Sequence, residues 1–207
     1  MQSILIVANG VWPEGFHLVH EIKNYAAVVA LDGAANRLVQ IGLFPNVVLG
    51  DLDSIDGEVL DQCKAAQVNI IGTPDQERSD ISKGLEWVHT NYPGSRVEIV
   101  GVEIGRYDHH LAAYSVLFEC NSSATIILNG WKACRVSSTP RRIHTKPNKI
   151  LSLLPFGTVT GVHLEGCQYP LQSETLTTGT RGISNRATES TITASVETGH
   201  LLLLIER

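Results

Sequence analysis

The stretch Val47–Ile55, with the sequence VVLGDLDSI, decides how the fold is interpreted. Three apolar residues typical of a strand run into Gly50, and the carboxylates of Asp51 and Asp53 follow at positions i and i+2. Such a pair has two interpretations. Asp and Ser side chains form turns by bonding neighbouring backbone N–H groups, whereas Mg²⁺ is typically held by one or two carboxylates together with substrate phosphates.

Short apolar segments alternate with helical patterns on both sides of this stretch. The expected strands are residues 3–8, 27–31, 47–49, 68–71, 97–100 and 125–128, and helical patterns begin near Phe16, Leu38, Val59, Ser79 and Leu111. Ser79 is suited to cap the fourth helix. Strands that alternate with helices indicate parallel βαβ units. We therefore predict a layered, parallel-sheet α/β domain over residues 1–130.

The pattern changes after residue 130 to short strand candidates separated by glycines. The candidates are residues 150–154, 158–164, 191–196 and 201–205, and residues 191–196 alternate with period two. This pattern predicts a smaller all-β domain, sandwich-like or barrel-like, over residues 131–207. The basic stretch Thr139–Lys149 is expected to be a solvated loop.

Composition excludes several classes of protein. The chain has 207 residues, 43% of them hydrophobic, and a net charge of −5. It lacks the basic surface of a nucleic-acid-binding protein, an apolar run of membrane-spanning length and the charged start of a signal peptide. We therefore expect a cytoplasmic protein with neither a nucleic-acid nor a membrane partner. The four cysteines contain no C-x-x-C pair, which argues against a zinc site.

Polar and charged residues follow consecutive strands of the predicted parallel sheet. They are Asp32 and Asn36 after the second strand, Asp51 and Asp53 after the third, Gln76 and Asp80 after the fourth, and Arg106 and Asp108 after the fifth. Ligands of open parallel sheets bind beyond the carboxyl ends of the strands. Carboxylates that converge there repel one another unless a cation intervenes. The convergence favours a metal site over a simple turn at Asp51 and Asp53.

Arg106 is the cation among these carboxylates. It is either part of a structural ion pair or a clamp for phosphate oxygens. A metal ion and an arginine in an acidic pocket suit a nucleoside triphosphate. The sequence contains neither a P-loop nor a G-x-G-x-x-G motif, so we expect neither a Walker NTPase nor a dinucleotide-binding protein.

Six motifs occur in a defined order over nearly the whole chain. They are DGAAN (32–36), GDLDS (50–54), DQERSD (75–80), GRYDH (105–109), LPFG (154–157) and GISN (182–185). In this order they resemble the thiamine pyrophosphokinase family. The chain departs from the family pattern at Ala34, where a second glycine is usual, and at Ile104, where a glycine often precedes Gly105. Both departures bear on nucleotide preference.

The resemblance implies transfer of the diphosphoryl group of ATP to the hydroxyl of thiamine, giving thiamine diphosphate and AMP with the aid of Mg²⁺. It implies a homodimer with the site at the interface. The implied metal ligands are Asp51, Asp53 and Asp80. The implied ATP-binding residues are Asp32, Asn36, Asp51, Gln76 and Arg106, and the implied thiamine-binding residues are Gln76, Asp80, Ser184 and Asn185. Arg106 would stabilise developing charge, and the proton acceptor is one of these carboxylates or Asp108.

Three alternatives remain at this point. A related Mg-dependent diphosphokinase would act on another heterocyclic alcohol, such as a hydroxymethylpterin. A non-catalytic module would bind a nucleotide or thiamine without turnover, and a phosphatase-like hydrolase would use the aspartate pair to release phosphate. The GISN motif at 182–185 favours thiamine, and the amount of convergent charge argues against simple binding.

Overall fold

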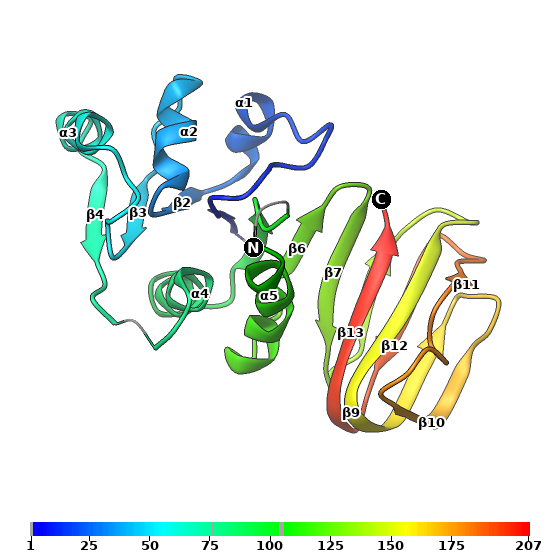
Figure 1. Ribbon diagram of the computed structural model, residues 1–207. Helices are drawn as coiled ribbons and strands as arrows, with labels where there is room; N and C mark the ends of the chain where they lie inside the picture. The colour runs from blue at the N-terminus through cyan, green and yellow to red at the C-terminus, as the bar shows by residue number, and fades with distance from the viewer. Residues whose placement is uncertain (1, 76, 104–105) are drawn as a thin grey trace. The chain divides into compact units, whose positions relative to one another are not determined.

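The computed structural model describes residues 2–75, 77–103 and 106–207. The chain divides into two compact units, residues 1–129 (unit 1) and 130–207 (unit 2) (Figure 1). Unit 1 holds a parallel sheet between helices and unit 2 is built from antiparallel strands, so the predicted fold class is confirmed.

Unit 1 is built on six parallel strands in the order β4-β3-β2-β1-β5-β6. Their bounds are β1 Ser3–Val7, β2 Ala27–Leu31, β3 Val47–Gly50, β4 Asn69–Gly72, β5 Arg96–Val100 and β6 Thr125–Leu128. The inner strands are buried on both faces, which is why β1, β2 and β3 appear in the sequence as continuous apolar runs. The inner strand β5 is interrupted by the buried Glu98.

Helices cover both faces of this sheet (Figure 1). One face packs against α1 Leu18–Glu21, α2 Ala34–Gln40 and α3 Gly57–Ala65, and the 3₁₀ turn η1 Ile22–Asn24 follows α1. The other face packs against α4 Asp80–Asn91 and its neighbour α5 Tyr107–Glu119. Ser79 caps α4 as predicted, because its side chain accepts a hydrogen bond from the Ser82 backbone N–H. Gly84 lets α4 approach the sheet: a Cβ there would lie 2.8 Å from Leu31 Cδ2.

The strand order reverses direction at β1, which has β2 on one side and β5 on the other. Such a switch point leaves a crevice beyond the carboxyl ends of the strands. Here the segments that follow β1 and β5 are joined by a hydrogen bond of 2.6 Å from Gly10 N to Gly101 O. Gly101 has a φ of +79°, and a Cβ at this position would collide with Ala8 O.

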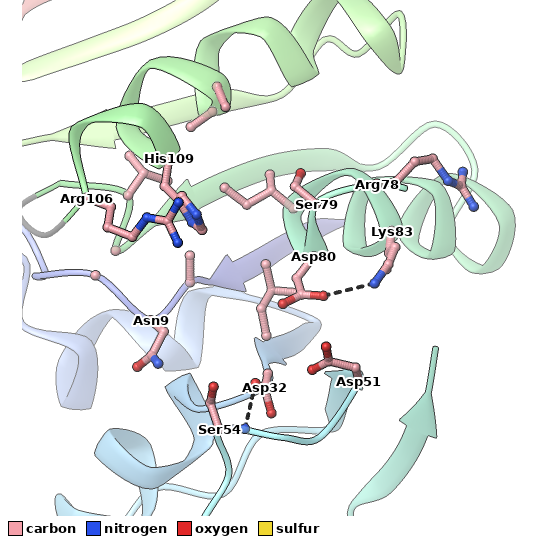
Figure 2. Close-up of a pocket in the computed structure, with 18 of the residues that line it drawn as sticks. Asn9, Asp32, Asp51, Ser54, Arg78, Ser79, Asp80, Lys83, Arg106 and His109 are labelled. Atoms are coloured by element: carbon pink, nitrogen blue, oxygen red, sulfur yellow. Dashed lines mark hydrogen bonds and ion pairs between the residues drawn. The ribbon is translucent and has the colours of Figure 1, made fainter. Parts of the chain in front are cut away.

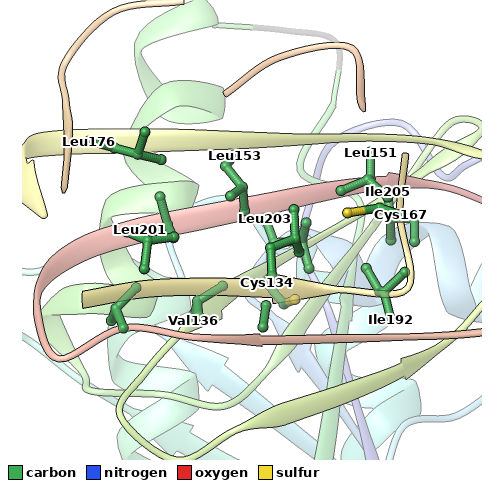
Figure 3. Close-up of a cluster of buried hydrophobic side chains, with 14 of the residues drawn as sticks. Cys134, Val136, Leu151, Leu153, Cys167, Leu176, Ile192, Leu201, Leu203 and Ile205 are labelled. Carbon is green, nitrogen blue, oxygen red and sulfur yellow. The ribbon is translucent and has the colours of Figure 1, made fainter. Parts of the chain in front are cut away.

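Unit 2 is organised around one long strand, β9 Ile150–Glu165. The first half of β9 pairs with β13 Thr198–Glu206 and β11 Asn185–Arg186, and its second half with β10 Leu171–Thr177 and β12 Thr191–Ser195. β7 Trp131–Val136 pairs with β13, and β8 Arg141–His144 pairs with β12. Figure 3 shows the buried core between these strands, with Leu153, Leu201 and Leu203 among its members.

Two predictions for unit 2 are wrong. The strand candidates 150–154 and 158–164 form the single strand β9, which continues through Pro155 to Gly157. The stretch Thr139–Lys149 is not a loop throughout, because it contains the strand β8.

Among the residues that the structure describes, no helix combines the length and the apolar character needed to cross a membrane.

Candidate active site

A pocket of about 550 Å³ lies beyond the carboxyl ends of the strands of unit 1 (Figure 2). Segments that follow β1, β2, β3 and β5 line it, together with parts of α4 and α5. Its polar walls include Asn9, Asp32, Asp51, Asp80, Lys83 and Arg106. The pocket therefore lies where the strand-end residues were predicted to converge.

Three carboxylates form an acidic cluster: Asp32, Asp51 and Asp53 each offer an oxygen within 4.8 Å of the others. Asp32 is the buried member, with 5% of its surface exposed. Its Oδ2 accepts a hydrogen bond of 3.1 Å from Ser54 N, while its Oδ1 is buried without a partner among the described residues. Burial raises the pKa of Asp32, the bonds from Ser54 oppose that rise, and the charges of Asp51 and Asp53 add to it.

The turn after β3 holds these carboxylates in place. Leu52 adopts a left-handed φ of +65°, and Asp51 Oδ1 accepts from Asp53 N at 3.4 Å. Ser54 Oγ donates to Asp53 Oδ1 at 2.8 Å. The two interpretations of the aspartate pair are therefore compatible, because the turn chemistry directs the carboxylates that a cation would need. Gly50 is required at the start, since a Cβ there would lie 2.8 Å from Asp32 Cβ.

Asn36 supports the same turn from α2. Its Nδ2 donates to Ser54 O at 3.0 Å, and its Oδ1 accepts from Asp56 N at 2.9 Å. Asn36 was predicted to bind ATP, and the structure places it against the backbone of the turn.

The acidic cluster fits a hard divalent cation. Carboxylate oxygens are the ligands that Mg²⁺ prefers, and a buried oxygen without a partner, such as Asp32 Oδ1, is costly unless a cation or donor satisfies it. The structure thus brings Asp32 together with the predicted ligands Asp51 and Asp53. Asp80, the third predicted ligand, lies outside this group of three.

Asp80 begins α4 and is paired with a lysine that the sequence analysis missed. Lys83 Nζ lies 3.3 Å from Asp80 Oδ1 and 3.5 Å from Thr73 O, as the dashed line in Figure 2 shows for Asp80. Lys83 is only 6% exposed although it lines the pocket. One signal was available: residues i and i+3 of a helix share a face, so the predicted helix already placed Lys83 beside Asp80.

Arg106 lines the pocket at the start of α5 and forms a fork with Asp108. Its Nη2 lies 2.6 Å from Asp108 Oδ2, and its Nε lies 3.2 Å from Asp108 Oδ1. Hydrogen bonds from Arg106 are the main cause that lowers the pKa of Asp108 to about 2. The ion-pair interpretation of Arg106 is therefore confirmed, and the clamp for phosphate oxygens stays a prediction, for which the fork leaves three of the five donors of Arg106.

The predicted thiamine-binding residues Ser184 and Asn185 belong to unit 2. Ser184 is exposed and has a left-handed φ of +61°, and its N–H donates to Ser152 Oγ at 3.1 Å. The side chain of Asn185 is buried. Gln76 and Ile104 lie outside the described residues.

Comparisons with known proteins identify the family. The sequence profile described as "Thiamin pyrophosphokinase, catalytic domain" matches residues 18–128, and "Thiamin pyrophosphokinase, vitamin B1 binding domain" matches residues 140–203. The chain is 27% identical over 215 aligned positions to thiamine pyrophosphokinase from Bacillus subtilis, covering 99% of this chain and 98% of that protein. It is 28% identical over 108 positions to thiamin pyrophosphokinase 1 from Caenorhabditis elegans, covering 48% of this chain and 43% of that protein.

The fold agrees with these matches. The crystal structure of the Bacillus subtilis protein superimposes with a TM-score of 0.83 at 24% identity, covering 99% of both chains. The catalytic-domain profile alone spans more than half of the 207 residues, and its match contains the acidic cluster, Lys83 and Arg106. The chain belongs to the thiamine pyrophosphokinase family.

Proposed function

We propose that this protein transfers the diphosphoryl group of ATP to the hydroxyl of thiamine and releases thiamine diphosphate and AMP. One observation carries the proposal within this family: the acidic cluster, which has an unpartnered buried oxygen, contributes two of its members to the pocket that Arg106 and Lys83 also line. Diphosphoryl transfer depends on positioning and on neutralising phosphate charge more than on covalent chemistry. A pocket with carboxylates for a cation and with cations for phosphate oxygens meets both needs.

The acidic cluster is the part of the pocket that would hold Mg²⁺. Asp51 and Asp53 contribute exposed carboxylates from one turn, and Asp32 contributes its buried oxygen from the end of β2. The ion supplies positive charge beside the transferred phosphates when it is bound. Asp80 faces the same pocket from α4, where it completes the metal site or meets thiamine.

The cationic side chains take the phosphate oxygens. Arg106 has donors left over from its fork with Asp108, and a guanidinium suits phosphate geometry. Lys83 supplies a second fixed positive charge, because its ammonium is held by Asp80 and Thr73 O.

The proton acceptor for the thiamine hydroxyl is better sought among the pocket carboxylates than at Asp108. A carboxylate whose pKa lies at about 2 is a weak base. Asp32 has the opposite shift, because burial raises its pKa.

In this proposal the α/β domain, residues 1–130, binds Mg-ATP and the β-rich domain, residues 131–207, binds thiamine. The match of the vitamin B1 binding profile to residues 140–203 supports that division. Two chains form a homodimer, and each site takes residues from both. A cytoplasmic location remains a prediction.

Product analysis tests the reaction. Incubation with Mg-ATP and thiamine should yield AMP and thiamine diphosphate in equal amounts, and omission of thiamine should abolish AMP formation. Formation of ADP or free phosphate in place of AMP would reject the assignment and point to the hydrolase. Turnover of a hydroxymethylpterin in place of thiamine would point to the related diphosphokinase.

Complementation tests the shared site. Asp53→Asn and Ser184→Ala change residues of different units, so each variant alone should be impaired. When the two are mixed and allowed to exchange subunits, an interface site leaves about a quarter of all sites with both native residues. Recovery of activity supports the interface. If the variants exchange subunits, as a tagged pull-down would report, and activity is not recovered, each site lies within one chain.

A further inference from the structure

Arg37 of α2 binds the segment that follows β1. Its Nη1 donates to the backbone carbonyl of Gly10, and its guanidinium carbon lies 4.3 Å from the centroid of the Trp12 ring. Arg37 is half-buried and is not among the described residues that line the pocket. One side chain therefore holds this segment from behind by a charge-assisted hydrogen bond and by a cation–π contact.

The same segment is pressed against the segment that follows β5. Besides the bond from Gly10 N to Gly101 O, Val11 N donates to Glu103 O at 2.8 Å. A Cβ at Gly10 would collide with Gly101 O, so the two backbones touch without side chains between them. Both glycines line the pocket. A displacement of either segment therefore changes the wall of the pocket directly.

Asn9 is the side chain that the segment after β1 contributes to the pocket (Figure 2). A Cβ at Gly33 would lie 2.5 Å from Asn9 Nδ2, so this amide packs against the residue that precedes α2. Consecutive residues of α2 thus support two walls of the pocket. Asn36 bonds to Ser54 O in the turn after β3, and Arg37 bonds to the segment after β1.

The ring of Trp12 has no other polar anchor among the described residues. Its Nε1 is buried without a hydrogen-bond partner there, and a Cβ at Gly101 would lie 3.3 Å from its Cδ1. The ring therefore contacts the guanidinium of Arg37 and lies beside the segment after β5. Arginine suits this place, because its planar group stacks on a ring while its N–H groups remain able to donate.

We propose that Arg37 is a positioning residue for the nucleotide, which acts through Gly10 and Trp12 to hold the Asn9 wall of the pocket in the shape that Mg-ATP binds. This inference rests on the proposed function. A segment that is ordered before binding saves the entropy that the ligand would otherwise spend on ordering it. Without Arg37, Gly10 O loses its charged donor and the ring of Trp12 loses its polar contact, so Mg-ATP must order the segment itself.

Two substrates distinguish this role from a general effect on stability. Arg37→Ala should raise the Kd for Mg-ATP, measured by titration calorimetry, and the KM for ATP about tenfold each. The KM for thiamine should stay within about twofold. Arg37→Lys keeps the charge but loses the planar stack, and should cost about threefold in the Kd for Mg-ATP. Gln40→Ala changes an exposed side chain of the same helix, so this matched control should alter none of these constants.

The fluorescence of Trp12 tests how Arg37 acts. The chain has three tryptophans, so Trp87→Phe and Trp131→Phe together leave Trp12 as the only one. In this background, Arg37→Ala should increase the quenching of Trp12 by acrylamide, and Gln40→Ala should not. Saturating Mg-ATP should reverse the increase, because the bound nucleotide then orders the segment.

The outcomes separate the role of Arg37 from the proposed function. Arg37→Ala overturns the inference if it binds Mg-ATP as tightly as Gln40→Ala, if it raises both KM values equally, or if it leaves the quenching of Trp12 unchanged. If Arg37→Ala does not fold, Arg37→Lys and Trp12→Leu decide by the same comparison of the two substrates. If the wild type binds Mg-ATP but makes no thiamine diphosphate, the proposed function fails and the Kd values still decide the role of Arg37. A wild type that does not bind Mg-ATP overturns both.

Discussion

Two sets of carboxylates surround the pocket, and they differ in their partners. Asp75, Asp80 and Asp108 each pair with a cation two or three residues along the chain, namely Arg78, Lys83 and Arg106. Asp32, Asp51 and Asp53 have no ion pair with a lysine or arginine among the described residues. Each carboxylate of the paired set has a cationic partner, whereas the acidic cluster concentrates negative charge.

The difference shows which carboxylates are arranged for a cation from outside the chain. Three unpaired carboxylates whose oxygens lie within 4.8 Å repel one another. Such an arrangement is unfavourable for the protein alone and favourable with an ion. The substitutions below test whether the two sets have separate roles.

The largest loss of turnover is expected from Asp53→Asn. Removing one charge from the acidic cluster weakens the hold on Mg²⁺ and should lower kcat by about 10²–10³-fold with the fold intact. Steady-state rates of AMP formation across a Mg²⁺ titration measure the effect, and circular dichroism checks the fold. Asp56→Asn is the matched control, because Asp56 is exposed three residues later and its side chain caps no helix. Near-normal turnover of Asp53→Asn at limiting Mg²⁺ would remove Asp53 from the metal site.

Asp32→Asn should impair turnover about as strongly and stabilise the protein in the absence of metal. Burial raises the pKa of Asp32, so the folded chain favours its protonated form and the charged form destabilises the fold increasingly as pH rises through that pKa. An uncharged amide removes this cost at neutral pH, so Tm in the absence of metal should rise.

Calorimetry with and without Mg²⁺ measures both consequences of Asp32→Asn. The wild type should gain stability from Mg²⁺ by mass action, and the variant should lose most of that gain. An unchanged response to Mg²⁺ in the variant would assign the ion to a different set of ligands and would break the contrast between the two carboxylate sets.

An intermediate loss of activity is expected from Lys83→Met. This change leaves Asp80 without its partner and removes a nearly buried positive charge from the pocket. We expect kcat/KM for ATP to fall about tenfold, with partial recovery in Lys83→Arg. Lys64→Met is the matched control, because Lys64 forms the same i, i+3 pair with Asp61 on the exposed surface. Equal rates for the two methionine variants would mean that the Lys83–Asp80 pair is structural.

The sequence was sufficient to predict the pocket of unit 1 but not the membership of the acidic cluster. Buried parallel strands appear as continuous apolar runs, so their ends, and the polar residues there, could be placed. The choice between Asp32 and Asp80 as the third member depends on left-handed turns at Asp32 and Leu52, which no residue pattern revealed. Lys83 was missed because its place on a helix does not reveal whether it is buried.

Unit 2 was harder to predict, for physical reasons. Pro155 and Gly157 suggested a break, but β9 passes through both, with Pro155 opposite Leu201 of β13. The strand β8 carries only one apolar residue, Ile143, so its sequence lacks the alternation that marks a half-buried strand. Asn185 was assigned to thiamine by resemblance, and its hydrogen bonds to both backbone polar groups of Tyr169 were not predictable from the sequence.

The smallest loss of turnover is expected from Asp108→Asn. The pH dependence of this variant sharpens the contrast between the paired carboxylates and the acidic cluster. The pKa of Asp108 lies at about 2 because Arg106 bonds to it, so this carboxylate stays charged throughout the range in which activity is measured. If its role is to orient Arg106, the variant loses about threefold in kcat and keeps the wild-type shape of the pH profile. If Asp108 accepts the proton from thiamine, the variant loses most activity and the acidic limb of the profile changes. Rates of Asp108→Asn and the wild type between about pH 5 and 9 distinguish these outcomes.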